Sequence, residues 1–108
     1  MLRVLTNPVG VTSMSGIKPS ATIVAWPNPA HDKTEIDFDS EQPGWVRLDV
    51  FDLQGRMVKQ LVHKYMGQGP QKFTWDLSNQ MGRKVGAGIY LARLVRANQT
   101  LQIRMVVR

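Results

Sequence analysis

Apolar and polar residues alternate along most of the chain in short segments, and each segment is closed by residues that favour turns. Alternation with a period of two puts every second side chain on one face, which is typical of a half-buried β-strand. No segment keeps a helical period over three turns. The pattern predicts strands at Ala21–Trp26, Thr34–Phe38, Trp45–Asp52, Met57–Tyr65, Gln71–Trp75, Ile89–Arg96 and Leu101–Arg108.

Two sheets that each have one apolar face bury those faces against each other, so these strands favour an all-β, immunoglobulin-like antiparallel β-sandwich of about seven strands. In Met57–Tyr65 the apolar residues Val58 and Leu61 are out of phase, which predicts a β-bulge. In the preceding segment the alternation directs one set of side chains inward and the other outward: Val46, Leu48 and Val50 inward, Arg47 and Asp49 outward.

The length of 108 residues corresponds to one domain. Residues 1–20 are rich in Pro, Gly, Ser and Thr without periodicity, so we expect a linker or the end of a preceding domain there and the compact domain at 21–108. No stretch approaches the ~18–20 apolar residues of a membrane span, and the N-terminus lacks the pattern of a signal peptide. If the domain is exported, we expect either that the export signal lies elsewhere or that the chain is a fragment of a longer protein.

The segment between the fifth and sixth predicted strands is rich in glycine. Gly82, Gly86 and Gly88 are expected to permit positive φ in a sharp turn, and their spacing matches no phosphate-binding motif. The stretch "DLSNQMGRKV" (76–85) also resembles "DLQGRMV" (52–58), with three residues inserted after the shared Asp-Leu. We interpret the two as the same hairpin turn used twice.

Basic residues outnumber acidic ones, 14 to 8, and give a formal net charge of +6. Such a surface attracts anions, including nucleic acid, lipopolysaccharide and acidic lipid. The charges are spread over alternating strand positions, as expected of a solvated sheet face, so basicity alone selects no partner and no nucleic acid is expected. They are Arg47, Lys59, Lys72, Arg93, Arg96, Arg104 and Arg108.

The sequence contains no arrangement of residues typical of a catalytic or metal site, so we expect no enzyme activity, cofactor or metal. Cysteine is absent, and His31 and His63 lie far apart without a metal-ligand spacing. Asp76, Ser78 and Asn79 are spaced loosely like calcium ligands, but the glycine and distal glutamate of a calcium loop are missing. Turn capping explains these three residues more simply.

The three tryptophans leave a further alternative open, because exposed aromatic rings can stack on sugars. Trp75 shares the parity of Phe73 and is expected in the core, Trp26 ends a strand, and Trp45 begins one and is expected to be exposed. Core packing is favoured over an accessory carbohydrate-binding module.

Four motifs occur in one order: "WPNPA" (26–30), "VRLDVFDLQGRMVKQL" (46–61), "FTWDLSNQMGRKVGAGIYLARL" (73–94) and "IRMVVR" (103–108). Together, from Thr22 to Arg108, they resemble the C-terminal sorting domain of type IX secretion cargo. The immunoglobulin-like repeat of the flagellar hook-capping protein shares part of this pattern, so a structural or assembly repeat is the other alternative.

The resemblance implies a non-catalytic sorting and surface-attachment module that directs a passenger, located N-terminal to it, across the outer membrane. The protein would be secreted or held at the cell surface. The implied partners are the type IX translocon, a surface processing peptidase and anionic lipopolysaccharide. The terminal strand would offer a partner a free edge and outward charges. The residues expected to be recognised are Gly82, Gly86, Gly88, Ile89, Tyr90, Ile103, Arg104, Met105, Val106, Val107 and Arg108.

Overall fold

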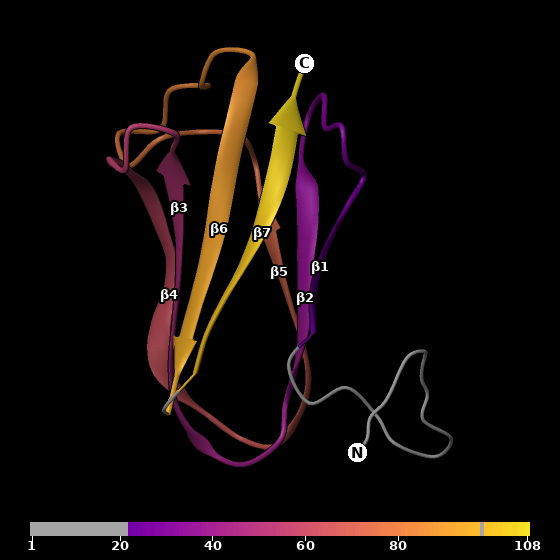
Figure 1. The fold of residues 1–108 in the computed structure, drawn as a ribbon, viewed down its shortest axis with the longest axis vertical. Coiled ribbons are helices and arrows are strands. Elements are labelled where there is room, and N and C mark those ends of the chain that lie inside the picture. The colour runs from indigo at the N-terminus through magenta and orange to yellow at the C-terminus, as the bar shows by residue number, and fades with distance from the viewer. Residues whose placement is uncertain (1–21, 98) are drawn as a thin grey trace, which may run out of the picture.

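The computed structural model describes residues 22–97 and 99–108, and every regular element in these ranges is a β-strand. The linker predicted for residues 1–20 lies outside the described residues. The expected all-β fold is confirmed, and each observed strand overlaps a predicted one (Figure 1). The strands are β1 (Ile23–Trp26), β2 (Thr34–Ser40), β3 (Gly44–Asp52), β4 (Met57–Met66), β5 (Gly69–Trp75), β6 (Gly88–Arg96) and β7 (Gln99–Val107).

The strands form two antiparallel sheets that face each other as a sandwich. One sheet has the order β1-β2-β5 and the other β4-β3-β6-β7. We call the end of the sandwich at which β7 finishes the upper end and the end at which β1 begins the lower end, as they appear in Figure 1. The connections 27–33, 53–56 and 76–87 lie at the upper end, whereas 41–43 and 67–68 lie at the lower end.

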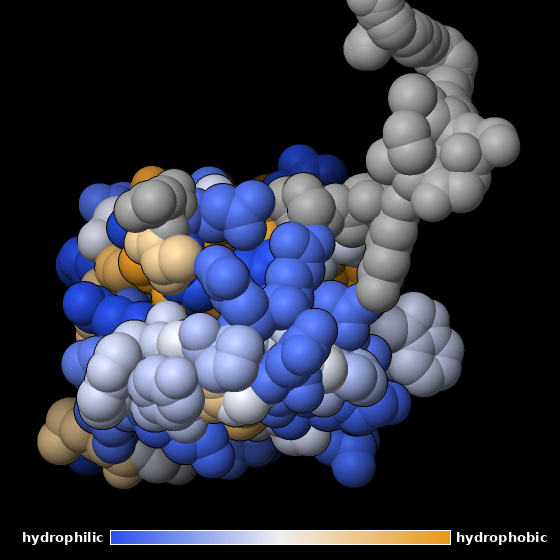
Figure 2. Space-filling view, turned by 90° about the horizontal axis from the view of Figure 1, so that it is seen from below, coloured by the Kyte–Doolittle hydropathy of each residue, from blue (hydrophilic) through white to orange (hydrophobic). Residues whose placement is uncertain are grey.

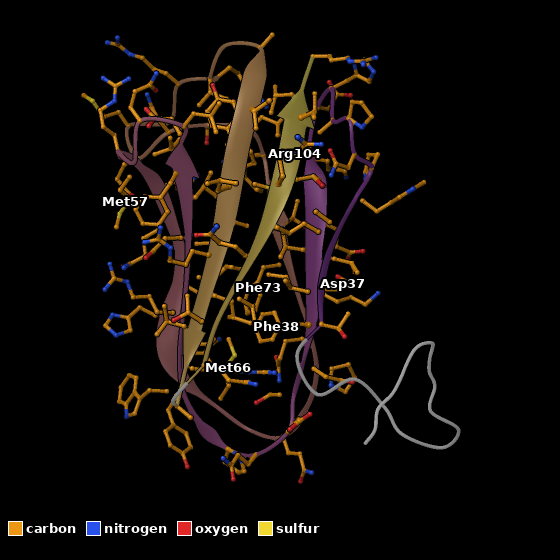
Figure 3. The ribbon with its side chains drawn as sticks, in the orientation of Figure 1. Asp37, Phe38, Met57, Met66, Phe73 and Arg104 are labelled. Atoms are coloured by element: carbon orange, nitrogen blue, oxygen red, sulfur yellow. The ribbon has the colours of Figure 1, made fainter. Side chains whose placement is uncertain are left out.

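The core lies between the two sheets and consists of the inward-facing side chains of both sheets. Phe38 of β2 and Phe73 of β5 stack with ring centroids 6.0 Å apart, and Figure 3 shows them pointing into this space near Met66. The inward set predicted for β3 is confirmed, since all its members are buried. The largest fully buried side chains are those of Trp75, Ile36, Leu48, Leu94, Met105, Val46, Val50 and Thr34.

The irregularity predicted in the fourth segment is also confirmed. Leu48 pairs with Val62 while Asp49 pairs with Gln60, so Leu61 has no partner in β3. A second register shift between Val50 and Phe51 skips Val58 in the same way. Each bulge adds one residue to β4 and strengthens its twist, which bends this edge strand around the core.

Two charged residues predicted to be solvated are buried instead. Asp49 is only 3% exposed, and its Oδ2 accepts a hydrogen bond of 2.7 Å from Arg47 Nε. It lies on the outer face of β3, where its register partners are Gln60 of β4 and Arg93 of β6, so long side chains flank it on both sides. The other is Arg96, which shares the parity of the buried Leu94 and therefore points inward at the lower end. Its guanidinium donates to the carbonyl of Asp39 in the opposite sheet.

Candidate recognition site

The two sequence segments predicted to be recognised lie side by side at the upper end. β6 and β7 are antiparallel neighbours, and their register pairs Gly88 with Val107, Ile89 with Val106 and Tyr90 with Met105. Both segments therefore belong to one continuous piece of sheet, and β7 is the edge strand of that sheet (Figure 1).

The edge of β7 is not free along the predicted segment, which corrects the expectation of an open docking edge there. Asn28 Nδ2 donates to Arg104 O and Asn28 Oδ1 accepts from Val106 N, both at 2.9 Å. The backbone of Ala30 continues this pairing, donating to Val106 O at 2.8 Å and accepting from Arg108 N at 2.9 Å. We call these bonds the Asn28–Ala30 clasp. Only the lower half of β7, residues 99–103, lies at the sheet edge without a corresponding clasp among the described residues.

Burial divides the predicted recognition residues into groups. Met105 and Val107 are buried in the core, so in the folded domain their side chains pack and are not accessible to a partner. Four others are half-buried: Ile89, Tyr90, Ile103 and Val106. The exposed members are Gly82, Gly86, Gly88, Arg104 and Arg108.

The upper loop 76–87 is fixed by two aromatic side chains. Trp75 Nε1 donates to the carbonyl of Ser78 at 2.9 Å, and Tyr90 Oη donates to the carbonyl of Gly86 at 2.8 Å. The two rings meet edge to face with centroids 5.4 Å apart. A further backbone bond from Val85 N to Leu77 O closes the loop on itself. The loop is thus held at both ends by the core.

Two turns at the upper end have the same hydrogen bonds, which confirms the repeated hairpin chemistry but corrects its alignment. Asp52 Oδ1 accepts from the N–H groups two and four residues later, at 3.0 and 2.9 Å. Asn79 Oδ1 does the same at 2.9 and 3.1 Å. Gly55 and Gly82 occupy equivalent positions with φ of 85° and 86°. Asn79, and not Asp76, is therefore the counterpart of Asp52, and no insertion separates the two turns.

The glycine prediction holds at two of its three positions. Gly82 and Gly88 have positive φ, of 86° and 155°, whereas Gly86 does not. Gly86 instead provides the carbonyl that accepts the Tyr90 hydroxyl.

A groove lies between the two equivalent turns and was not anticipated from the sequence. Gln80 N donates to Val58 O at 2.9 Å and Gln80 Oε1 accepts from Gln60 N at 3.0 Å, which holds the turns side by side. The hollow measures about 680 Å³, and Ile89 and Tyr90 form part of its lining. Its rim carries exposed apolar side chains, Leu53, Met57 and Met81; Figure 3 shows Met57 at this end. Large apolar residues inside polar turns were the signal available in the sequence.

Two carboxyl groups at the upper end have shifted pKa values, and turn hydrogen bonds explain both. The backbone N–H of Arg56, followed by its guanidinium, lowers the pKa of Asp52. The hydroxyl of Ser78 and the charge of Lys59 lower the pKa of Asp76. Ser78 N also donates to Asp76 Oδ1 at 3.1 Å, so the interpretation of this acidic stretch as turn capping is confirmed.

Within residues 22–97 and 99–108, no group of three or more His, Cys, Asp or Glu side chains is placed to hold a metal ion. The same ranges contain no helix of the length and apolarity needed to cross a membrane.

Comparisons with known proteins agree on the fold. The chain is similar to part of dimeric latent PorU from Porphyromonas gingivalis, with 23% identity and a TM-score of 0.64 over 90% of this chain. It is also similar to part of PorZ, described as an essential surface component of the type IX secretion system of that organism, with 19% identity and a TM-score of 0.60 over 80% of this chain. The match covers 10% of PorU and 11% of PorZ.

No curated protein sequence is significantly similar to the chain. The family model described as "Secretion system C-terminal sorting domain" matches residues 24–108, which include all seven strands except the first residue of β1. Since this match covers most of the sequence and the whole upper end, the chain belongs to the secretion system C-terminal sorting domain family.

Proposed function

We propose that this domain directs a passenger through the type IX secretion system to the cell surface or the medium, and that the upper end is the part recognised. The family match supports the sorting role. The observation that carries the choice of site is the pairing of both predicted segments beside the groove. The described part of the domain begins just before β1 at the lower end, so a passenger N-terminal to the domain would be connected at the end opposite the groove and would leave the upper end accessible.

The chemistry of the groove defines the kind of receptor surface it would fit. Leu53 and Met81 give the rim of the groove an exposed apolar surface, Arg56 also lines the groove, and Arg83 is an exposed residue of the second turn. A complementary surface would combine apolar side chains with acidic ones. We assign this role to a component of the type IX translocon.

Processing and attachment form the second part of the proposal. A surface peptidase would cleave N-terminal to the domain, and anionic lipopolysaccharide would be the acceptor for the released passenger. Exposed Arg104 and Arg108 supply positive charge near the end of β7 for such an anion. In this proposal the domain binds the translocon component and the anion, and it catalyses no reaction itself.

Export of a reporter tests the sorting role. A fluorescent protein with an export signal, followed by residues 1–108, would be expressed in a bacterium with an active type IX system. We expect the reporter at the surface or in the medium. Retention in the periplasm, with the domain folded, would refute the proposal.

Paired surface substitutions test the choice of site. Leu53→Ser combined with Met81→Ser should reduce export about tenfold or more, because burying one apolar side chain contributes ~1.5–3 kcal/mol and ~1.4 kcal/mol corresponds to tenfold in affinity. Val24→Ser is the matched control, since Val24 is also apolar and exposed but lies in β1, away from the groove. Equal export by the groove variant and the control would show that recognition occurs elsewhere.

A further inference from the structure

Exposed aromatic side chains gather at the lower end of the four-stranded sheet, far from the groove. Trp45 is 64% exposed and Tyr65, its partner in the register of β3 and β4, is 58% exposed. The Trp45 ring meets Tyr65 at a centroid distance of 6.1 Å and an angle of 86°, and meets His63 at 5.9 Å and 63°. Neither neighbour stacks flat on the indole, and most of its surface remains accessible.

A hollow of about 420 Å³ adjoins the indole. Trp45, Arg47, His63 and Val95 line it, so an aromatic surface stands beside two side chains that can hydrogen-bond. This volume lies within the ~300–1,000 Å³ typical of small-molecule sites, which combine apolar walls with a few placed polar groups. A pyranose ring has this dual character, with C–H groups on its faces and hydroxyls around its rim.

Charge compensation at the hollow favours a neutral ligand. Arg47 Nε lies 2.7 Å from the buried carboxylate of Asp49, which balances its charge. Arg96, the other arginine of the lining, is buried and directs its guanidinium to the carbonyl of Asp39 in the opposite sheet. A nucleic acid strand would instead require uncompensated cations along its backbone.

The surface around Trp45 and Tyr65 also suits a hydrated ligand. Figure 2 views the molecule from the lower end, where hydrophilic side chains predominate and apolar surface is confined to small areas between them.

We propose that Trp45, Tyr65 and His63, together with Arg47, form a binding site for a neutral polysaccharide. The site is independent of sorting, because it lies at the end of the sandwich opposite the groove. The domain would thereby hold its passenger on a glycan while the upper end stays accessible.

Affinity electrophoresis of the 108-residue chain tests this proposal. The chain has a pI near 10.2, so native gels are run toward the cathode, with and without hydroxyethyl cellulose, mixed-linkage β-glucan or glucomannan. We expect at least one neutral glycan to retard the protein, and Trp45→Ala to weaken the retardation at least tenfold. Tyr65→Ala should weaken it less.

Trp26→Ala is the matched control, since Trp26 is 76% exposed but lies at the upper end and has no ring contact among the described residues. Thermal unfolding of each variant checks the fold, and Trp45→Phe, which keeps an aromatic face, should retain part of the binding. The proposal is overturned if no neutral glycan retards the chain, if Trp26→Ala has the same effect as Trp45→Ala, or if a single-stranded oligonucleotide binds more tightly through Trp45. The Trp45→Ala variant should be exported normally in the reporter assay, which separates this site from the sorting function.

Discussion

Replacing Trp75 by Phe removes the hydrogen bond that fixes the upper loop while keeping an aromatic ring in the core. The carbonyl of Ser78, a residue only 2% exposed, loses its donor. A buried polar group left without a partner costs ~1–3 kcal/mol. The smaller ring leaves a cavity of ~40 Å³, which at ~24 cal/mol per Å³ costs ~1 kcal/mol more. The free energy of unfolding should therefore fall by about 2–4 kcal/mol.

Such a loss is measurable, because domains of this size are stable by only ~5–15 kcal/mol. Circular dichroism during thermal unfolding should show a midpoint lowered by at least ~8 °C, at ~4–8 °C per kcal/mol. Trp45→Phe is the control: its side chain is exposed, so the change should stay within ~0.5 kcal/mol. Tyr90→Phe loses only the hydrogen bond from the hydroxyl to the carbonyl of Gly86, so its loss of unfolding free energy should lie between those of the other two variants, at ~0.5–1.5 kcal/mol. If Trp75→Phe were no less stable than Trp45→Phe, the buried bond would not hold the loop and the reasoning would fail.

Three further changes test the turns and the clasp. Asp52 has a pKa below its ordinary value of 3.8 in the folded protein, so its contribution to stability is present above that pH and lost as the pH falls through the lower folded value. Asp52→Asn should therefore flatten the acid side of the stability curve measured by denaturant unfolding, and an unchanged acid side would contradict this assignment. Gly82→Ala should lower the free energy of unfolding by ~1–2 kcal/mol, because Gly82 has a φ of 86° that an L side chain rarely adopts. Space is not the reason, since no atom lies within 4 Å of an added Cβ. Gly44→Ala is the control: Gly44 is equally open but lacks positive φ, so its stability in urea unfolding should stay nearly unchanged. Asn28→Ala removes both side-chain hydrogen bonds to β7. Amide hydrogen exchange at Val106 should become about tenfold faster, since a net loss of ~1.4 kcal/mol corresponds to a factor of ten. Unchanged exchange would mean that the backbone bonds of Ala30 alone hold the strand in place.

The local features of the fold could be predicted from the sequence because strand periodicity is a local property. Val46, Leu48 and Val50 are buried as their alternation indicates. The two phase breaks in the fourth strand, at Val58 and Leu61, mark the two bulges, because an extra residue shifts every following side chain to the other face.

Features that depend on neighbouring strands could not be predicted in this way. Asp49 has the parity of an outward residue, yet adjacent strands and the side chain of Arg47 bury it. Arg96 does share the parity of the inward Leu94, but its hydrogen-bond acceptor, the carbonyl of Asp39, is identified only once the opposite sheet is in place. At the candidate site, residue identity favoured aligning Asp76 with Asp52, whereas the hydrogen bonds show that Asn79 is the equivalent residue.

The Asn28–Ala30 clasp has a consequence for the order in which the domain is built. Its side-chain bonds join residues 76 and 78 positions apart, and Met105 and Val107 of the same strand complete the core. A polypeptide emerging from the ribosome cannot close the sandwich until residue 107 has been added, and contacts of such long range form slowly. A chain whose translation stops within β7 would lack the native fold, so this module can serve as a tag only on passengers that have been synthesised through to this strand.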